Sequence, residues 1–255
     1  MQHRSQRVRF ANSKGLFLSG IIEWPVEPTK RFAIFSHCFT CTKDLKAIVR
    51  ISRCLATHGI AVLRFDFTGL GDSQGDFSST TFVDNQSDVV AAAEYLQANF
   101  ESPQLLIGHS LGGAAMISSA PRISSVQGVV TIASPSDTLH LANLLSRMNP
   151  DIEQTGSGTV VIGGRTHLIR VGMIEQLRRT DLPTAFRELR MPLLIFFPLE
   201  DETLPFRHGI EALQLAGGPV SFVTLEGSDH LLVKRPGDPD FVADMIRTWG
   251  NRNLQ

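Results

Sequence analysis

Ser110 is the residue of this chain whose neighbours best prepare it to act as a nucleophile. It stands at the centre of GHSLG, residues 108–112, which is a G-x-S-x-G motif. An apolar run precedes the motif and a run of small residues follows it, as expected where a strand turns tightly into a helix. We therefore predict Ser110 to be a catalytic nucleophile. The alternative role, an ordinary helix N-cap, is compatible with catalysis because a helix N-terminus stabilises negative charge.

A serine hydroxyl needs a base to take its proton and an acid to orient that base. In sheets with this kind of strand-to-helix turn, the partners follow in the order serine, acid, histidine, each after a later strand. Asp201 follows one later apolar run, and His230 lies in a polar Gly-Ser-Asp loop after the last one. We predict Asp201 as the acid and His230 as the base. Asp137 is the alternative acid, and a surface pair with Asp229 is the alternative role of His230.

Cys38 and Cys41 form a C-x-x-C motif directly after an apolar run and His37. A dithiol redox site, a metal site and a loop with another task are the three functions that fit it. A thioredoxin-like dithiol should open a helix within a much smaller fold. A zinc site needs two further ligands at suitable spacing, which Cys54 alone does not supply. We predict no metal, and the redox and loop alternatives stay open at this point.

Two periodicities alternate along the rest of the chain. Residues 8–24 predict a hairpin that turns at residues 12–15, since Lys14-Gly15 accepts the positive φ of a tight turn. Short continuous apolar runs follow, as is typical of strands buried on both faces. Amphipathic segments of helical length separate most of these runs, at residues 43–58, 82–99, 111–120, 206–216 and 241–251. The alternation predicts an α/β fold with a mostly parallel central sheet of about eight strands and helices on both faces.

Residues 136–188 interrupt this alternation with a leucine-rich helical stretch, a polar Gly-Ser turn region, a hairpin at 158–169 and a helix at 172–180. The insertion is too long for a connecting loop, so we predict a lid over the sheet edge, with residues 1–135 and 189–255 as the core. Four apolar side chains share one stripe of the leucine-rich helix: Leu141, Leu144, Leu145 and Met148. They pack the lid onto the core or line a substrate pocket.

Composition narrows the class of protein. The 255 residues are 42% apolar and carry 24 basic against 25 acidic side chains, which suits one large globular unit. The balanced charge disfavours a nucleic-acid-binding protein, which would gather excess lysine and arginine on one face. No apolar run approaches the length of a membrane helix, and we predict a cytoplasmic protein.

The motifs together resemble the α/β-hydrolase fold family, in its serine-hydrolase branch. More narrowly, SHCFTCTKDLKA at residues 36–47, GIAVLRFDFTGLGDSQGDFSST at 59–80, LLIGHSLGGAA at 105–115 and EGSDHLL at 226–232 resemble the hydrolase segment that many bacteria carry fused to an OsmC-like thiol-peroxidase domain. The resemblance covers residues 8–250. It suggests a separately encoded OsmC-like peroxidase as a partner.

The resemblance also implies an oxyanion hole. In the family, the loop after the third strand begins His-Gly-x, and the backbone N–H of x joins the N–H that follows the nucleophile. The positions that match are Phe39 and Leu111, with Cys38 where glycine is usual. The C-x-x-C motif then serves as scaffold for the loop, although a reversible disulfide that distorts the loop remains a hypothesis. His37 and His109 are expected to lie beside the substrate.

A second glycine-rich stretch, at residues 66–73, matches a structural loop of the family through Asp66, Gly69, Gly71 and Ser73. No helix opens at the spacing that a dinucleotide site requires, so we predict no cofactor. Asp66 is expected to accept backbone hydrogen bonds in this turn.

The activity that follows is cleavage of carboxylic esters, or of thioesters, with small to medium apolar acyl groups through an acyl-serine intermediate. Alternatives are a peptidase or amidase acting on small substrates, and a non-catalytic or redox-gated partner protein on the same scaffold.

Overall fold

The N-terminal hairpin forms one edge of the sheet in the computed structural model, which describes residues 4–254. Strands β1 (Arg4–Ala11) and β2 (Phe17–Trp24) pair antiparallel in the register Ala11 to Phe17. Gly15 adopts a φ of +75°, and the Asn12 side chain accepts the Leu16 N–H at 3.1 Å. The predicted turn is therefore confirmed, and it closes through one asparagine and one glycine.

Eight strands form the central sheet in the order β1-β2-β4-β3-β5-β6-β9-β10. The remaining strands are β3 (Phe32–Ser36), β4 (Ala61–Phe65), β5 (Leu105–His109), β6 (Gly128–Ile132), β9 (Leu193–Pro198) and β10 (Val220–Leu225). All neighbours from β4 to β10 are parallel. Every residue of β3, β4, β5, β6 and β9 is buried, which is why these strands are continuous apolar runs in the sequence.

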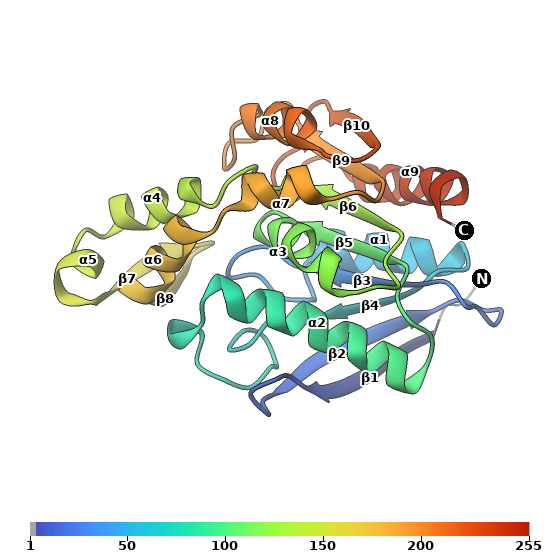
Figure 1. The fold of residues 1–255 in the computed structure, drawn as a ribbon, viewed down its shortest axis with the longest axis horizontal. Coiled ribbons are helices and arrows are strands. Elements are labelled where there is room, and N and C mark those ends of the chain that lie inside the picture. The colour runs from blue at the N-terminus through green and yellow to red at the C-terminus, as the bar shows by residue number, and fades with distance from the viewer. Residues whose placement is uncertain (1–3, 255) are drawn as a thin grey trace.

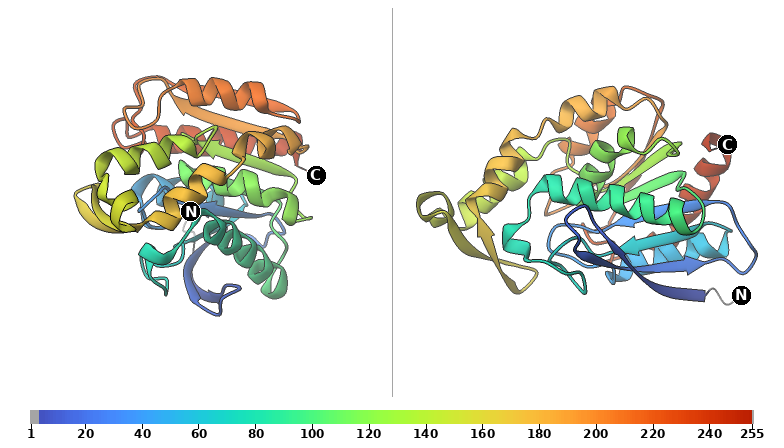
Figure 2. Two further views of the ribbon diagram at one scale, coloured as in Figure 1. Left: turned by 60° about the vertical axis from the view of Figure 1, so that its left-hand side comes forward. Right: turned by 60° about the horizontal axis from the view of Figure 1, so that its bottom comes forward.

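Helices cover both faces of the sheet (Figures 1 and 2). On one face lie α2 (Phe82–Asn99), α3 (Leu111–Ser119), α7 (Leu182–Glu188) and α8 (Arg207–Leu215), and on the other lie α1 (Lys46–Thr57) and α9 (Asp238–Asn253). Successive strand residues serve opposite faces: Ile34 belongs to the first core and Phe35 to the second. The predicted α/β-hydrolase architecture is confirmed.

The chain between β6 and β9 forms a separate group of elements that projects from one end of the sheet (Figure 1). They are α4 (Leu139–Met148), α5 (Asp151–Thr155), β7 (Ser157–Ile162), β8 (Arg165–Arg170) and α6 (Val171–Arg179), and the chain returns to the face of the sheet through α7. Strands β7 and β8 form a hairpin of their own, as predicted, with both Gly163 and Gly164 at positive φ in its turn. We call residues 136–188 the inserted segment.

Two short helices of the inserted segment were not predicted. Helix α5 has only five residues and lies in the polar turn region. Helix α7 follows Asp181, whose side chain accepts the Thr184 N–H at 3.1 Å, and Pro183 occupies its first turn. An N-cap followed by proline is a start signal for a helix, so α7 was detectable from the sequence.

The single-turn 3₁₀ helices η1 (Phe77–Ser79) and η2 (Ala120–Arg122) complete the described chain. Among residues 4–254, none of the helices combines the length and the apolar character needed to cross a membrane.

Candidate active site

Ser110 occupies the sharp turn between β5 and α3, where its backbone adopts a φ of +53° and a ψ of −125°. The glycines on either side have no room for a side chain. A Cβ atom on Gly108 would lie 2.5 Å from the Gly112 carbonyl oxygen, and one on Gly112 would lie 2.4 Å from the His37 carbonyl oxygen. The turn that presents Ser110 leaves no space for side chains at residues 108 and 112, which explains why the motif has glycine at both positions.

The structure brings the predicted nucleophile, base and acid into one hydrogen-bonded chain. His230 Nε2 lies 3.0 Å from Ser110 Oγ, and His230 Nδ1 lies 2.6 Å from Asp201 Oδ2. The other carboxylate oxygen of Asp201 accepts the N–H groups of Thr203 and Leu204, both at 2.8 Å. Three loops at the ends of β5, β9 and β10 therefore converge, in the serine, acid, histidine order predicted from the sequence.

Asp201 is held as a carboxylate although its side chain is fully buried. Burial by itself raises the pKa of this group, but the hydrogen bond to His230 and the N–H donors of Leu204 and Thr203 bring the pKa below its usual range. An ionised Asp201 binds the Nδ1–H of His230. That tautomer leaves the Nε2 lone pair free to accept the Ser110 hydroxyl proton.

Asp137, the alternative acid, forms its hydrogen bond at the start of α4 and not with His230. One of its oxygens accepts the His140 N–H at 3.1 Å, and the other lies 3.8 Å from His208 Nδ1. Asp229 does not pair with the His230 ring, since its Oδ1 accepts the Val233 N–H at 2.7 Å. The geometry therefore favours Asp201 over both.

The two predicted oxyanion donors, Phe39 and Leu111, border the same cavity as Ser110. Within residues 4–254, neither backbone N–H donates to a protein acceptor. Leu111 is the first residue of α3, where the N–H has no partner inside the helix and the dipole is positive. Both amides are thus available to a negative oxygen beside Ser110.

Cys38 and Cys41 are joined by a disulfide that encloses Phe39 and Thr40. The Cys41 N–H also donates to the Cys38 carbonyl at 3.2 Å, and Thr40 adopts a φ of +59°. Cys54 is a free thiol on α1. The bridge closes a tight turn around the predicted oxyanion donor, as a scaffold for the loop would.

Lys43 anchors the end of this loop, a role that no motif in the sequence revealed. Its side chain is 4% exposed, and its ammonium lies 2.8 Å from Asp66, 2.8 Å from Asp72 and 3.0 Å from Asp44. Burial lowers the pKa of Lys43, but its hydrogen bonds, led by the one to Asp66, outweigh that cost and raise the pKa above its usual range. Asp66 also accepts the Asp72 N–H at 3.0 Å, which confirms its predicted role in the turn.

His37 and His109 do not line the cavity, which corrects the expectation that they contact substrate. His37 accepts the Phe67 N–H at 3.2 Å, so its other nitrogen, 2.8 Å from the Cys38 oxygen, donates. His109 Nε2 lies 2.7 Å from the His230 carbonyl oxygen, and burial together with repulsion from His230 lowers the pKa of His109 to about 3. Both rings are buried and hold backbone groups near the site through hydrogen bonds.

A cavity of about 730 Å³, which we call the catalytic cavity, opens in front of Ser110 and His230. Leu141, Leu144 and Met148 of α4 line it, which is the second of the two roles considered for this stripe. Leu145 does not, because it is fully buried on another face of α4 and packs in the core.

The walls of the catalytic cavity are otherwise mostly apolar. Its further lining residues are Cys38, Phe39, Thr40, Cys41, Thr42, Asp44, Leu45, Leu111, Pro135, His140, Val161, Ile162, Gly163, Arg165, Thr203, Leu204 and Leu231. They come from both the core and the inserted segment, so substrate contacts would be shared between the two.

Comparison with known proteins supports this picture. A family profile described as "Alpha/beta hydrolase family" matches residues 33–245. The crystal structure of the esterase domain of a Rhodothermus marinus protein is similar over the whole of both chains, with 38% identity and a TM-score of 0.80.

The chain is also similar to the mitochondrial palmitoyl-protein thioesterase ABHD10 of mammals. The rat protein is 25% identical over 77% of this chain and 68% of its own length. The human protein is 24% identical over 68% of this chain and 58% of its own length, so the chain spans less than two thirds of that relative.

Proposed function

The chain belongs to the alpha/beta hydrolase family, and we propose that it is a serine hydrolase that cleaves carboxylic esters or thioesters through an acyl-Ser110 intermediate. One observation carries the proposal: the continuous hydrogen-bonded chain from Ser110 through His230 to Asp201, at the wall of a mostly apolar cavity. A serine in such a chain is activated as a nucleophile, whereas an ordinary N-cap serine is not.

In the proposed reaction, His230 Nε2 takes the hydroxyl proton as Ser110 Oγ attacks the carbonyl carbon of the substrate. The oxygen that becomes negative accepts hydrogen bonds from the Phe39 and Leu111 amides, each worth about 3 kcal/mol of barrier in comparable sites. The carbon–oxygen or carbon–sulfur bond breaks, and His230 returns the proton to the leaving alcohol or thiol. His230 next deprotonates a water that attacks the acyl-enzyme, which releases the acid and restores the Ser110 hydroxyl.

The substrate class follows from the walls of the catalytic cavity. Apolar side chains from α4 and the β7–β8 hairpin face Ser110 and favour an apolar acyl group. The names of two relatives, an esterase domain and a palmitoyl-protein thioesterase, support ester and thioester bonds alike. We therefore propose small to medium acyl groups, with either an alcohol or a thiol as leaving group.

The proposal is tested by labelling the protein with a fluorophosphonate, identifying the modified peptide by mass spectrometry, and measuring turnover of p-nitrophenyl acetate and butyrate. Ser110→Ala should remove the label and lower kcat by about 10⁴-fold or more, since the hydroxyl forms the covalent bond. Circular dichroism should show an unchanged fold. Turnover that survives in Ser110→Ala would contradict the assignment.

Two alternatives to ester hydrolysis remain predictions for this fold: amide cleavage and a non-catalytic binding function. Amide cleavage would use the same side chains but requires better protonation of the leaving amine, so aminoacyl amides belong in the substrate panel. A non-catalytic protein that binds an OsmC-like peroxidase would leave Ser110 unlabelled, and a stoichiometric partner would be recovered from cells.

A further inference from the structure

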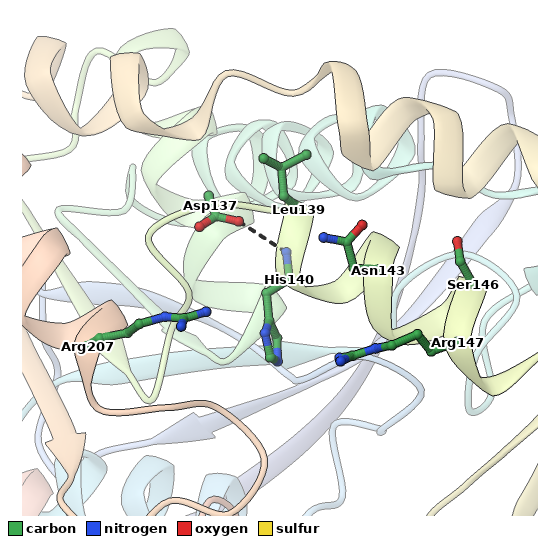
Figure 3. Close-up of a pocket in the computed structure, with 7 residues that line it drawn as sticks. All are labelled: Asp137, Leu139, His140, Asn143, Ser146, Arg147 and Arg207. Atoms are coloured by element: carbon green, nitrogen blue, oxygen red, sulfur yellow. Dashed lines mark hydrogen bonds between the residues drawn. The ribbon is translucent and has the colours of Figure 1, made fainter.

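A second cavity, of about 520 Å³, lies beside the catalytic cavity. Its lining residues come from the loop after β6, from α4 and from the start of α8: Asp137, Leu139, His140, Asn143, Ser146, Arg147 and Arg207 (Figure 3). Ser110 and His230 are not among them, so this hollow has no part in the chemistry described above. We call it the arginine cavity.

Two arginine side chains converge on the arginine cavity from different elements. Arg147 stands in the last turn of α4, and Arg207 is the first residue of α8. Figure 3 shows both guanidinium groups extending toward the His140 ring from opposite sides. Both residues are exposed to solvent, and two like charges that face one hollow give it a positive potential that attracts an anion.

Neither guanidinium is neutralised by the protein itself. Among residues 4–254, no hydrogen bond or ion pair engages the side chain of Arg147 or Arg207. Arg178, also on the inserted segment, is by contrast paired, because it binds both carboxylate oxygens of Glu153 at 2.9 and 2.8 Å. The planar fork of arginine fits carboxylate and phosphate groups in that same two-point manner.

The acidic residue of the arginine cavity offsets only part of this positive charge. Asp137 caps the first turn of α4 through the His140 N–H, and its other oxygen faces His208 Nδ1 at 3.8 Å. The lining side chains still carry two guanidinium charges against one carboxylate. The Asn143 amide adds hydrogen-bond donors beside them.

His140 lines both cavities, so the two hollows are adjacent at this residue. Its Nε2 lies 3.3 Å from the carbonyl oxygen of Thr203, a residue of the catalytic cavity. Helix α4 is the shared wall: Leu141 and Leu144 face the catalytic cavity, whereas Arg147 faces the arginine cavity. A substrate bound at Ser110 would therefore have to extend past His140 to reach the two arginines.

We propose that Arg147 and Arg207 bind an anionic group, a carboxylate or a phosphate, carried by the substrate away from the bond that is cleaved. This assignment rests on the proposed ester or thioester hydrolysis. It makes the preferred substrate an acid derivative with an apolar part at Ser110 and a negative charge beyond His140.

The test compares charged with neutral substrates of equal shape. On the acyl side, mono-p-nitrophenyl glutarate, adipate and suberate are set against their terminal carboxamides. On the leaving-group side, butyryl thioesters of 3-mercaptopropionate are set against those of 3-mercaptopropionamide. The ratio of kcat/KM for the charged over the neutral member should fall about tenfold in Arg147→Gln and in Arg207→Gln for at least one pair, because a charge-assisted hydrogen bond is lost.

Controls separate this proposal from the hydrolase assignment. Arg179→Gln removes an exposed arginine of the inserted segment that lines neither cavity, and it should leave the ratio unchanged. Arg207→Lys should restore part of the ratio. Turnover of neutral p-nitrophenyl butyrate reports the proposed hydrolysis alone, so its absence in the wild type would overturn that function rather than the site.

Inorganic phosphate distinguishes a free anion from a substrate group. Phosphate should compete with the charged substrates in the wild type and lose this effect in the double variant Arg147→Gln/Arg207→Gln. Charged-to-neutral ratios that stay the same in every arginine variant, with neutral turnover intact, would overturn the proposal. Phosphate binding without any such ratio change would overturn it as well, because the site would then serve a separate anion.

Discussion

Three histidines near Ser110 differ in role because their surroundings differ. His230 keeps a free Nε2 toward the serine, since Asp201 binds its Nδ1–H. His37 and His109 are buried beneath the loops, and burial lowers the pKa of each. Neutral rings at these two positions donate single N–H bonds to the carbonyls of Cys38 and His230. The two buried imidazoles therefore hold backbone groups, which leaves His230 as the imidazole that we propose transfers protons.

His109 should make the stability of the protein depend on pH. Its pKa is about 3 in the folded chain and ordinarily 6.5, so between these values the unfolded chain binds more protons and stability falls with falling pH. From pH 6.5 to pH 5 the loss through this residue should be about 2 kcal/mol. His109→Gln, which keeps an N–H donor for the His230 carbonyl, should remove that part of the loss.

Urea unfolding of both proteins at pH 8, 7 and 5 measures the effect. The change in the free energy of unfolding between pH 8 and pH 7 should be the same in both proteins, since His109 binds few protons above pH 7 in either the folded or the unfolded chain. An equal loss of stability between pH 7 and pH 5 in the wild type and in His109→Gln would contradict a buried neutral imidazole.

At the level of elements, the loop between β3 and α1 combines a disulfide, a buried ion pair and an oxyanion donor within a few residues. Cys38 and Cys41 enclose Phe39, and Lys43 binds Asp66 at 2.8 Å where the loop ends. Phe39 lines the catalytic cavity in this structure, in which the disulfide is closed. We therefore expect the closed bridge to support the loop, and the hypothesis that a reversible disulfide distorts it stays open to test.

Reducing this bridge should slow the reaction without unfolding the protein. We expect dithiothreitol, and the variant Cys41→Ser, to lower kcat for p-nitrophenyl butyrate about tenfold, because misplacing one oxyanion donor loses part of its stabilisation. The loss of stability should be no more than about 2 kcal/mol, since the bridge closes a very short loop. Cys54→Ser is the matched control. Equal turnover by the oxidised and reduced proteins would remove redox gating from consideration.

The elements that follow from local pattern were the ones predictable from the sequence. Buried strands such as β5 are continuous apolar runs, and the glycines around Ser110 mark a turn that excludes side chains. Features that depend on distant parts of the chain were not predictable. The Lys43–Asp66 pair joins residues 23 positions apart, and the burial of Leu145 rather than Leu144 depends on which neighbours α4 meets.

At the scale of the whole molecule, the core carries the groups that we propose react, and the inserted segment supplies much of the apolar wall opposite them. Ser110, Asp201 and His230 belong to loops of the central sheet. Leu141, Leu144 and the β7–β8 hairpin belong to residues 136–188. The proposed function thus places chemistry and selectivity in different parts of the fold, and a substitution on α4 should change the selectivity without changing the chemistry.

Leu144→Trp should test this division by filling part of the catalytic cavity. Leu144 is partly buried and lines the cavity of about 730 Å³, so the larger indole should occupy space that a long acyl chain needs. We expect kcat/KM for p-nitrophenyl octanoate to fall at least tenfold, about the effect of a lost apolar contact or a steric clash in a hydrophobic pocket, while turnover of the acetate stays within about twofold. Ile210→Trp, at an exposed position on α8, is the control and should change neither value. If the acyl-length profile of Leu144→Trp matches that of the wild type, then Leu144 does not contact the acyl chain, and the selectivity must come from the other walls of the cavity, which are the rest of α4, the β7–β8 hairpin and the core loops.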